Sequence, residues 1–180
     1  MNVNSILASF IKYVTPITHK TRRESLRAAV QSCMEKQELT VTGIGRGIAG
    51  TTKEKHRIKR ADRLLSNRWL QIERPLAYGA LIKLLISHLP RPVIHIDWSD
   101  LDAHRGNYLL RASLAFKGRA LTLYEQVYPL TKKEKPEENQ RFLELLKDML
   151  PHNCKPIIVT DSGFKVPWFR LVQQQGWDFI

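Results

Sequence analysis

The second half of the chain alternates short apolar segments with charged turns, a pattern that predicts strands and helices of a mixed sheet. Val93–Ile96 is an apolar strand that runs directly into Asp97. Two more strands are expected over Asn107–Phe116 and Arg119–Tyr128, joined by a short hairpin turn at Lys117 and Gly118. Helix, strand, helix and strand then follow in that order: Glu137–Leu150, Pro156–Thr160, Val166–Gln175 and Trp177–Ile180.

The first half has the apolar spacing of short helices. These are expected over Thr21–Lys36, Lys53–Leu65 and Trp69–Leu89, with a short helix and a Gly-rich turn in Leu39–Gly50. Thr21 and Glu24 have the spacing of a capping box at the start of the first of these helices.

Gly45, Gly47 and Gly50 match a dinucleotide-binding fingerprint, but no buried strand precedes them, which favours a turn. Helices do not continue through Pro90 and Pro92, so we expect a helical domain over residues 1–90 and a second domain over residues 91–180.

Charge is divided unequally between these two halves. The formal net charge is +12, with 16 basic and 6 acidic side chains in residues 1–90 and 13 and 11 in residues 91–180. A dense basic group lies on the expected helix Lys53–Leu65, and its members are Lys53, Lys55, Arg57, Lys59, Arg60 and Arg63. Such a cluster favours contact with the phosphates of double-stranded DNA, and the alternative is an ordinary solvated helix face.

Several protein classes are excluded by simple counts. No apolar run approaches the roughly 20 residues that span a bilayer, and the N-terminus lacks the features of an export signal. The two cysteines, Cys33 and Cys154, are too few for a disulfide framework or a four-thiolate zinc site. The sequence therefore predicts a cytoplasmic protein without a membrane partner.

Two apolar strands each lead into an aspartate, Asp97 and Asp161. If the strands are parallel neighbours, their axes lie about 4.8 Å apart, and both carboxylates can reach one ion. Carboxylate oxygens suit Mg²⁺ or Mn²⁺, and such ions support phosphodiester chemistry. The alternative is that either aspartate shapes a turn or caps a helix. Asp100 and Asp102 are expected to be turn or surface residues.

The motifs around these aspartates resemble those of bacterial insertion-sequence DDE transposases of the cut-and-paste branch. The resemblance rests on Asp97-Trp-Ser-Asp100, Leu110-Arg-Ala-Ser113, Leu123-Tyr-Glu125 and Thr160-Asp-Ser-Gly-Phe-Lys-Val-Pro-Trp168, and the basic stretch His56–Asn67 resembles the family's DNA-binding region. It implies an N-terminal helical DNA-binding domain followed by a mixed sheet with helices, an incomplete ribonuclease-H-like core of α+β or α/β class. Asp97 and Asp161 would be the first two of three catalytic carboxylates, which hold Mg²⁺ or Mn²⁺.

The same resemblance implies partners and a reaction. The substrates would be terminal inverted-repeat DNA and target DNA, held by a homodimer in the synaptic complex of the full-length protein, in the bacterial cytoplasm and at the nucleoid when bound. The reaction would be phosphodiester hydrolysis at the transposon end, followed by strand transfer. The family's third carboxylate, a Glu on a later helix, has no matching motif in these 180 residues. We therefore expect a truncated transposase with little or no turnover alone.

Two other hypotheses remain open at this point. The chain could be a catalytically inactive DNA-binding fragment that inhibits the full-length transposase. It could also be another ribonuclease-H-like nuclease or integrase with a different substrate.

Overall fold

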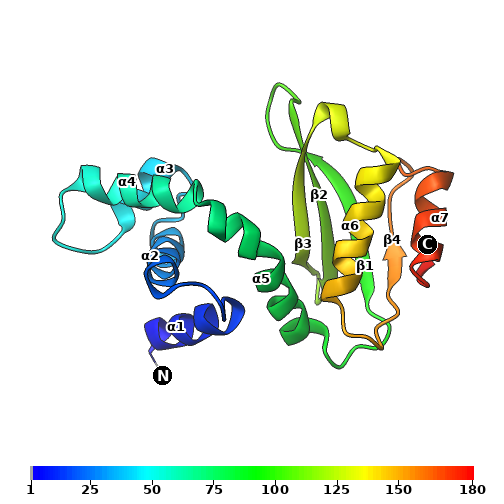
Figure 1. Ribbon diagram of the computed structural model, residues 1–180, viewed down its shortest axis with the longest axis horizontal. Helices are drawn as coiled ribbons and strands as arrows, with labels where there is room; N and C mark the ends of the chain where they lie inside the picture. The colour runs from blue at the N-terminus through cyan, green and yellow to red at the C-terminus, as the bar shows by residue number, and fades with distance from the viewer. Residues whose placement is uncertain (1) are drawn as a thin grey trace. The chain divides into compact units, whose positions relative to one another are not determined.

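The computed structural model describes residues 2–180, which form two compact units, one ending at Ala80 and the other spanning Leu81–Ile180. The first unit is helical and the second contains a mixed sheet, as expected for the fold class (Figure 1). The N-terminal helices are α1 (Val3–Val14), α2 (Lys20–Lys36), α3 (Val41–Gly47), α4 (Glu54–Leu65) and α5 (Arg68–Ile86), the last of which continues past Ala80.

Glycines allow α3 to pack closely on its neighbours in the N-terminal unit. A Cβ atom on Gly45 would lie 2.4 Å from the Cα atom of Ile58 in α4, and one on Gly47 would lie 2.1 Å from Ser32 Oγ in α2. Both glycines lie inside α3, so the predicted turn can begin only after Gly47. Helix packing therefore explains Gly45 and Gly47 of the fingerprint-like spacing, whereas Gly50 lies after α3 with a φ of +140° and open space around it.

Helix α1 was not predicted from the sequence. Its buried residues Leu7, Ile11 and Val14 are spaced four and three apart, as on one helical face. The Asn2 side chain caps its start by accepting a hydrogen bond from the Asn4 N–H at 3.0 Å. The sequence therefore contained a cap residue followed by an apolar helix face. Because the opposite face is also apolar, the helical periodicity is hard to recognise.

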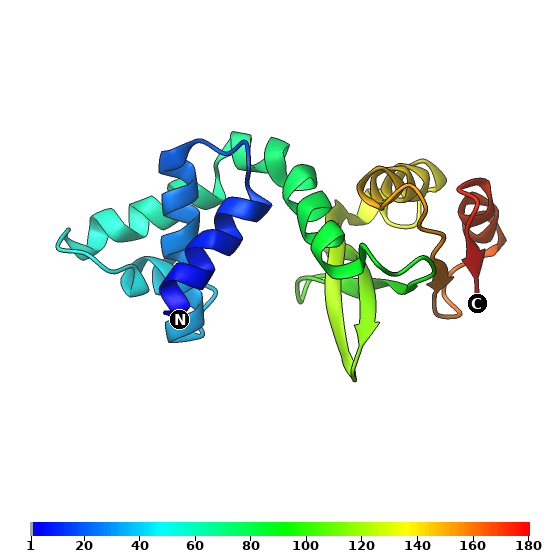
Figure 2. The ribbon, with the colours of Figure 1, turned by 90° about the horizontal axis from the view of Figure 1, so that it is seen from below.

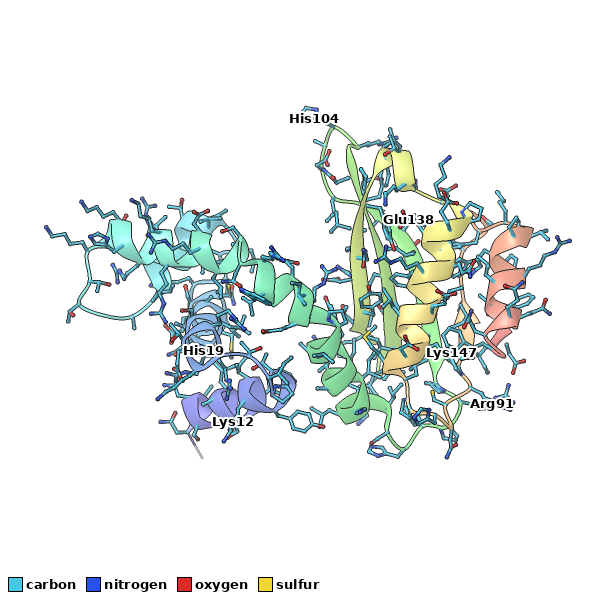
Figure 3. The ribbon with its side chains drawn as sticks, viewed as in Figure 1. Lys12, His19, Arg91, His104, Glu138 and Lys147 are labelled. Atoms are coloured by element: carbon cyan, nitrogen blue, oxygen red, sulfur yellow. The ribbon has the colours of Figure 1, made fainter. Side chains whose placement is uncertain are left out.

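The predicted capping box at the start of α2 is wrong. The N-cap is His19, labelled in Figure 3, and its Nδ1 accepts a hydrogen bond from the Thr21 N–H at 3.3 Å. Glu24 pairs instead with Arg27, 3.0 Å away and one turn along the helix. The helix begins at Lys20, two residues earlier than a capping box with Thr21 as the N-cap requires.

Within residues 2–180, five strands form one sheet in the order β3-β2-β1-β4-β5. Antiparallel pairs join β1 to β2 and β2 to β3, and parallel pairs join β1 to β4 and β4 to β5. Each strand lies where the sequence pattern predicts one: β1 (Val93–Asp100), β2 (Asn107–Phe116), β3 (Arg119–Pro129), β4 (Ile157–Val159) and β5 (Asp178–Phe179).

Helix α6 (Pro136–Met149) lies across one face of this sheet in both views (Figures 1 and 2). The rings of Phe142 in α6 and Tyr124 in β3 have centroids 4.9 Å apart, and both side chains are buried. Lys147, labelled in Figure 3, joins α6 to the end of α7 (Val166–Gln174) by donating to the Gln175 carbonyl at 3.0 Å. On the other sheet face, Asp97 of β1 lies in register with Arg111 of β2, which lies in register with Glu125 of β3.

We expect Gly45→Ala to destabilise the N-terminal unit. Alanine favours helix over glycine by about 1 kcal/mol, so an unobstructed site in α3 would gain stability. At Gly45 the new methyl group meets backbone atoms of Ile58, and overpacking of this kind costs about 1–3 kcal/mol. The midpoint of thermal unfolding, followed by far-ultraviolet circular dichroism, should therefore fall.

The matched control is Gly106→Ala, whose Cβ atom would lie an ordinary 3.7 Å from the nearest carboxylate oxygen of Asp102. This variant should leave the midpoint nearly unchanged. A higher midpoint for Gly45→Ala would contradict the close contact between α3 and α4.

Candidate functional site

Asp97 and Asp161 lie level with each other at neighbouring parallel strands. The register of β1 with β4 sets His95 opposite Val159. Two residues further along, the same register aligns Asp97, which is inside β1, with Asp161, which follows the end of β4. Because such strands lie about 4.8 Å apart, the two carboxylates enter the same region of space.

Both aspartates line one cavity of about 390 Å³ in the C-terminal unit. The cavity wall comes from β1, from α6 and the segment before it, and from α7 and the loop before it. It includes Trp98, Lys133, Glu134, Asn139, Gly163, Phe164, Lys165 and Trp168. Asp97 and Asp161 are solvent-exposed. The structure thus brings the two predicted carboxylates together at an accessible hollow.

The loop after β4 holds the Asp161 carboxylate in a fixed direction. Its Oδ1 atom accepts a hydrogen bond from the Gly163 N–H at 3.0 Å, and a Cβ atom at Gly163 would lie 3.0 Å from that oxygen. The turn-forming role considered as an alternative is therefore real. It leaves the Oδ2 atom without a hydrogen bond from residues 2–180, so the same side chain can also offer an oxygen to a ligand.

Asp97 stands at the end of a charged row that crosses three strands. It is paired in register with Arg111 of β2, which is paired with Glu125 of β3. Arg111 Nε donates to Glu125 Oε2 at 2.9 Å. No hydrogen bond or ion pair within residues 2–180 reaches the Asp97 carboxylate, so its charge is available to a cation.

Asp100 and Asp102 serve the turn after β1, as the sequence predicted. Asp100 forms an ion pair with Arg105 at 3.3 Å. Asp102 accepts hydrogen bonds from the N–H groups of Gly106 and Asn107, at 3.0 and 2.9 Å. The Gly106 hydrogen bond, with support from Asn107, lowers the pKa of Asp102 below its ordinary value.

Asn139 of α6 is a site residue that the sequence analysis missed. It is only 7% exposed, and its buried Oδ1 atom has no hydrogen-bond partner among residues 2–180. The indole Nε1 atoms of Trp98 and Trp168, which line the same cavity, are also buried without an acceptor in that range. Asn139 occupies a buried position one turn before Phe142 and Leu143, and a polar residue on that face was the available signal.

The six basic residues predicted to bind DNA do not share one environment. Lys53, Lys55, Lys59, Arg60 and Arg63 are exposed along α4 and at its start. Arg57 is half-buried, and its guanidinium donates to the Ile48 carbonyl at the end of α3 at 2.9 Å. Part of the charge cluster therefore already has a structural partner.

The residues at the cavity fit a hard cation in the chemistry of their donors. The wall carries the carboxylates of Asp97, Glu134 and Asp161 and the unpartnered amide oxygen of Asn139, and such oxygen donors suit Mg²⁺ or Mn²⁺. No group of three or more His, Cys, Asp or Glu side chains able to hold a metal occurs among residues 2–180. Asp97 and Asp161 are the two wall carboxylates for which the described residues provide no ion pair, because Glu134 pairs with Lys133 at 3.6 Å.

Comparison with known proteins gives one family. Residues 88–180, slightly more than half of the chain, match the transposase DDE domain, and this range contains both Asp97 and Asp161. No curated protein and no solved structure matches the chain. None of the helices described between residues 2 and 180 combines the length and apolar character needed to cross a membrane.

We expect Asn139→Leu to raise the free energy of unfolding. A buried polar atom without a partner costs about 1–3 kcal/mol, and leucine has a similar size and would extend the apolar face of α6. Urea denaturation measures the change. Asn153→Leu, on an exposed loop, is the control and should bring no gain. A loss of stability in Asn139→Leu would show that the amide makes a favourable interaction in the folded protein.

Proposed function

The chain belongs to the transposase DDE domain family, and on this premise we propose that it is an insertion-sequence transposase chain acting in cut-and-paste transposition. In this proposal residues 1–90 bind terminal inverted-repeat DNA, and residues 91–180 contribute two carboxylates to metal-dependent phosphodiester cleavage and strand transfer. The observation that carries it is the alignment of Asp97 and Asp161 at neighbouring parallel strands, facing one cavity.

The proposed roles follow from what each side chain has available. Asp97 and Asp161 would hold Mg²⁺ or Mn²⁺, with the Asn139 oxygen as a further donor from α6. When bound, such an ion polarises the phosphate and activates the attacking oxygen. Without a cation the two carboxylates repel the DNA backbone. Arg111, held by Glu125 next to Asp97, offers positive charge on the same sheet face for orienting a phosphate.

The remaining parts of the proposal concern partners and setting. Double-stranded DNA is the substrate, both as transposon ends and as target. A homodimer would hold two ends in the synaptic complex of the full-length protein. The setting would be the bacterial cytoplasm, with the protein at the nucleoid when it is bound to DNA. The excess of basic over acidic side chains in residues 1–90 supports the choice of a polyanionic partner.

We expect Asp97→Asn and Asp161→Asn each to weaken Mn²⁺ binding by about tenfold or more, because even the loss of a supporting residue around a metal site costs about 10–100-fold. Isothermal titration calorimetry with Mn²⁺ alone measures the affinity. Asp100→Asn is the matched control, because it also removes a carboxylate from β1, but one that is already paired with Arg105. Equal losses in all three variants would show that Mn²⁺ is not held at the cavity.

We expect the chain alone to give little or no cleavage of a labelled duplex carrying its transposon end, in the presence of Mg²⁺ or Mn²⁺. Two acidic ligands hold a metal ion more weakly than three and fix its position less well. Gel analysis of the labelled strands measures cleavage. Efficient cutting that is lost in Asp97→Asn would contradict the expected inactivity while supporting the assigned carboxylates.

No group of three or more His, Cys, Asp or Glu side chains placed to hold a metal ion occurs among residues 2–180, and this favours a second candidate function. The chain would then occupy transposon ends as an inhibitor of the full-length transposase. Adding it to an active full-length enzyme should slow end cleavage, and the Asp97→Ala/Asp161→Ala double variant should inhibit equally well. Inhibition that requires both aspartates would instead connect the effect to the carboxylate site.

A further inference from the structure

A second cavity, of about 360 Å³, lies between α2 and α4 within the N-terminal unit. We call it the α2–α4 cavity. The described residues of its wall include no Asp or Glu, whereas arginine, histidine, hydroxyl and amide side chains are all present. The groups used in the argument are Ser25, His56, Arg60, Arg63 and Asn67.

Hydrogen bonds to α2 hold Arg60 at the wall of this cavity. Its Nε atom donates to Ser25 Oγ at 3.1 Å, and one terminal nitrogen donates to the Glu24 carbonyl at 3.2 Å. These acceptors are neutral, so the guanidinium keeps its full positive charge. Because two contacts limit its rotation, Arg60 needs little further ordering to bind an anion.

Arg63 adds a second cation that has no acidic partner. No ion pair from residues 2–180 reaches it, and it is exposed. His56, Arg60 and Arg63 recur at spacings of four and three, so they lie on one face of α4. The nearby Arg22 is different, because Glu73, which is not part of the cavity wall, already pairs with it.

Asn67 lines the same cavity. Its Oδ1 atom accepts hydrogen bonds from the N–H groups of Trp69 and Leu70, at 3.0 and 3.2 Å, and so caps the start of α5. With its oxygen used in this way, the side chain has only its amide N–H groups to offer a ligand. The cavity therefore combines two cations with fixed and free donors and lacks a competing carboxylate.

We propose that the α2–α4 cavity binds a backbone phosphate of duplex DNA, an inference that rests on the proposed function and deepens it. An anion there meets Arg60, Arg63 and the Asn67 amide at once. The volume exceeds that of a single phosphate and accommodates part of the sugar next to it. Lys55 and Lys59 do not line this cavity, so the inference separates them from Arg60 and Arg63 within the basic cluster.

The sharpest test is Asn67→Asp in the full chain. Asp caps helices as well as Asn does, so the start of α5 is kept while a negative charge enters the cavity. Fluorescence anisotropy with a labelled transposon-end duplex should show DNA affinity falling about tenfold or more, because like charges are brought together. The control is Asn153→Asp, which changes net charge equally on an exposed loop and should lose far less. An unchanged thermal midpoint for Asn67→Asp verifies that the cap survives.

A second measurement uses salt. Arg63→Gln should lower the slope of log affinity against log salt by about 0.9, the contribution of one phosphate contact. Lys117→Gln, in the turn between β2 and β3, should leave the slope unchanged. If Asn67→Asp matches Asn153→Asp and the Arg63→Gln slope equals that of the wild type, DNA does not use the cavity and the inference is wrong.

Two further outcomes separate the sources of phosphate and the two proposals. Nuclear magnetic resonance with inorganic phosphate tests for a free-anion site. If phosphate shifts the Asn67 side-chain amide resonance but Asn67→Asp does not change duplex affinity, the cavity binds free anions and the assignment to DNA is wrong. A wild-type chain that shows no salt-dependent duplex binding would overturn the proposed function together with this inference. Salt-dependent duplex binding that is unaffected by substitutions in the α2–α4 cavity would overturn this inference and leave the proposed function standing.

Discussion

The parallel pairing of β1 with β4 is the constraint on which the candidate active site depends. Side chains alternate between the two faces of a strand, so a slip of one residue would move one carboxylate to the opposite face. The register is fixed by burial, because Ile94 and Ile158 are paired and both are 0% exposed. The packing of the apolar sheet face thus determines where Asp97 and Asp161 stand, although neither takes part in the core.

The succession of elements could be predicted because it depends on local periodicity. Every strand of the second half lies where alternation or an apolar run indicated one. Which strands pair with each other could not be predicted in this way. The strand β4 has only three residues, and its partner β1 is far away in the sequence. The sequence could therefore place the two aspartates together only on the condition that β1 and β4 are parallel neighbours, which periodicity does not show.

Single residues show why charge and polarity patterns incompletely describe the two candidate sites. Arg57 belongs to the basic cluster by sequence, yet its guanidinium binds a backbone carbonyl. Asn139 looks like an ordinary polar residue of an amphipathic helix, yet it is buried at the cavity with an unpartnered oxygen. Both facts depend on which neighbours approach from distant parts of the chain. The basic cluster and the aspartates could be identified from sequence, but their free and occupied groups could not.

In the proposed function, the distribution of charge assigns DNA affinity and phosphate chemistry to different side chains. Exposed carboxylates oppose the approach of DNA, so the residues around Asp97 and Asp161 are poorly suited to supplying affinity by themselves. The excess positive charge lies in residues 1–90, where Arg60 and Arg63 carry no acidic partner within residues 2–180. Under the proposed function, DNA would therefore be attracted by one set of side chains and would react at another. In the proposed function, DNA affinity would therefore not depend on the metal, because the groups that attract phosphate are separate from the two aspartates.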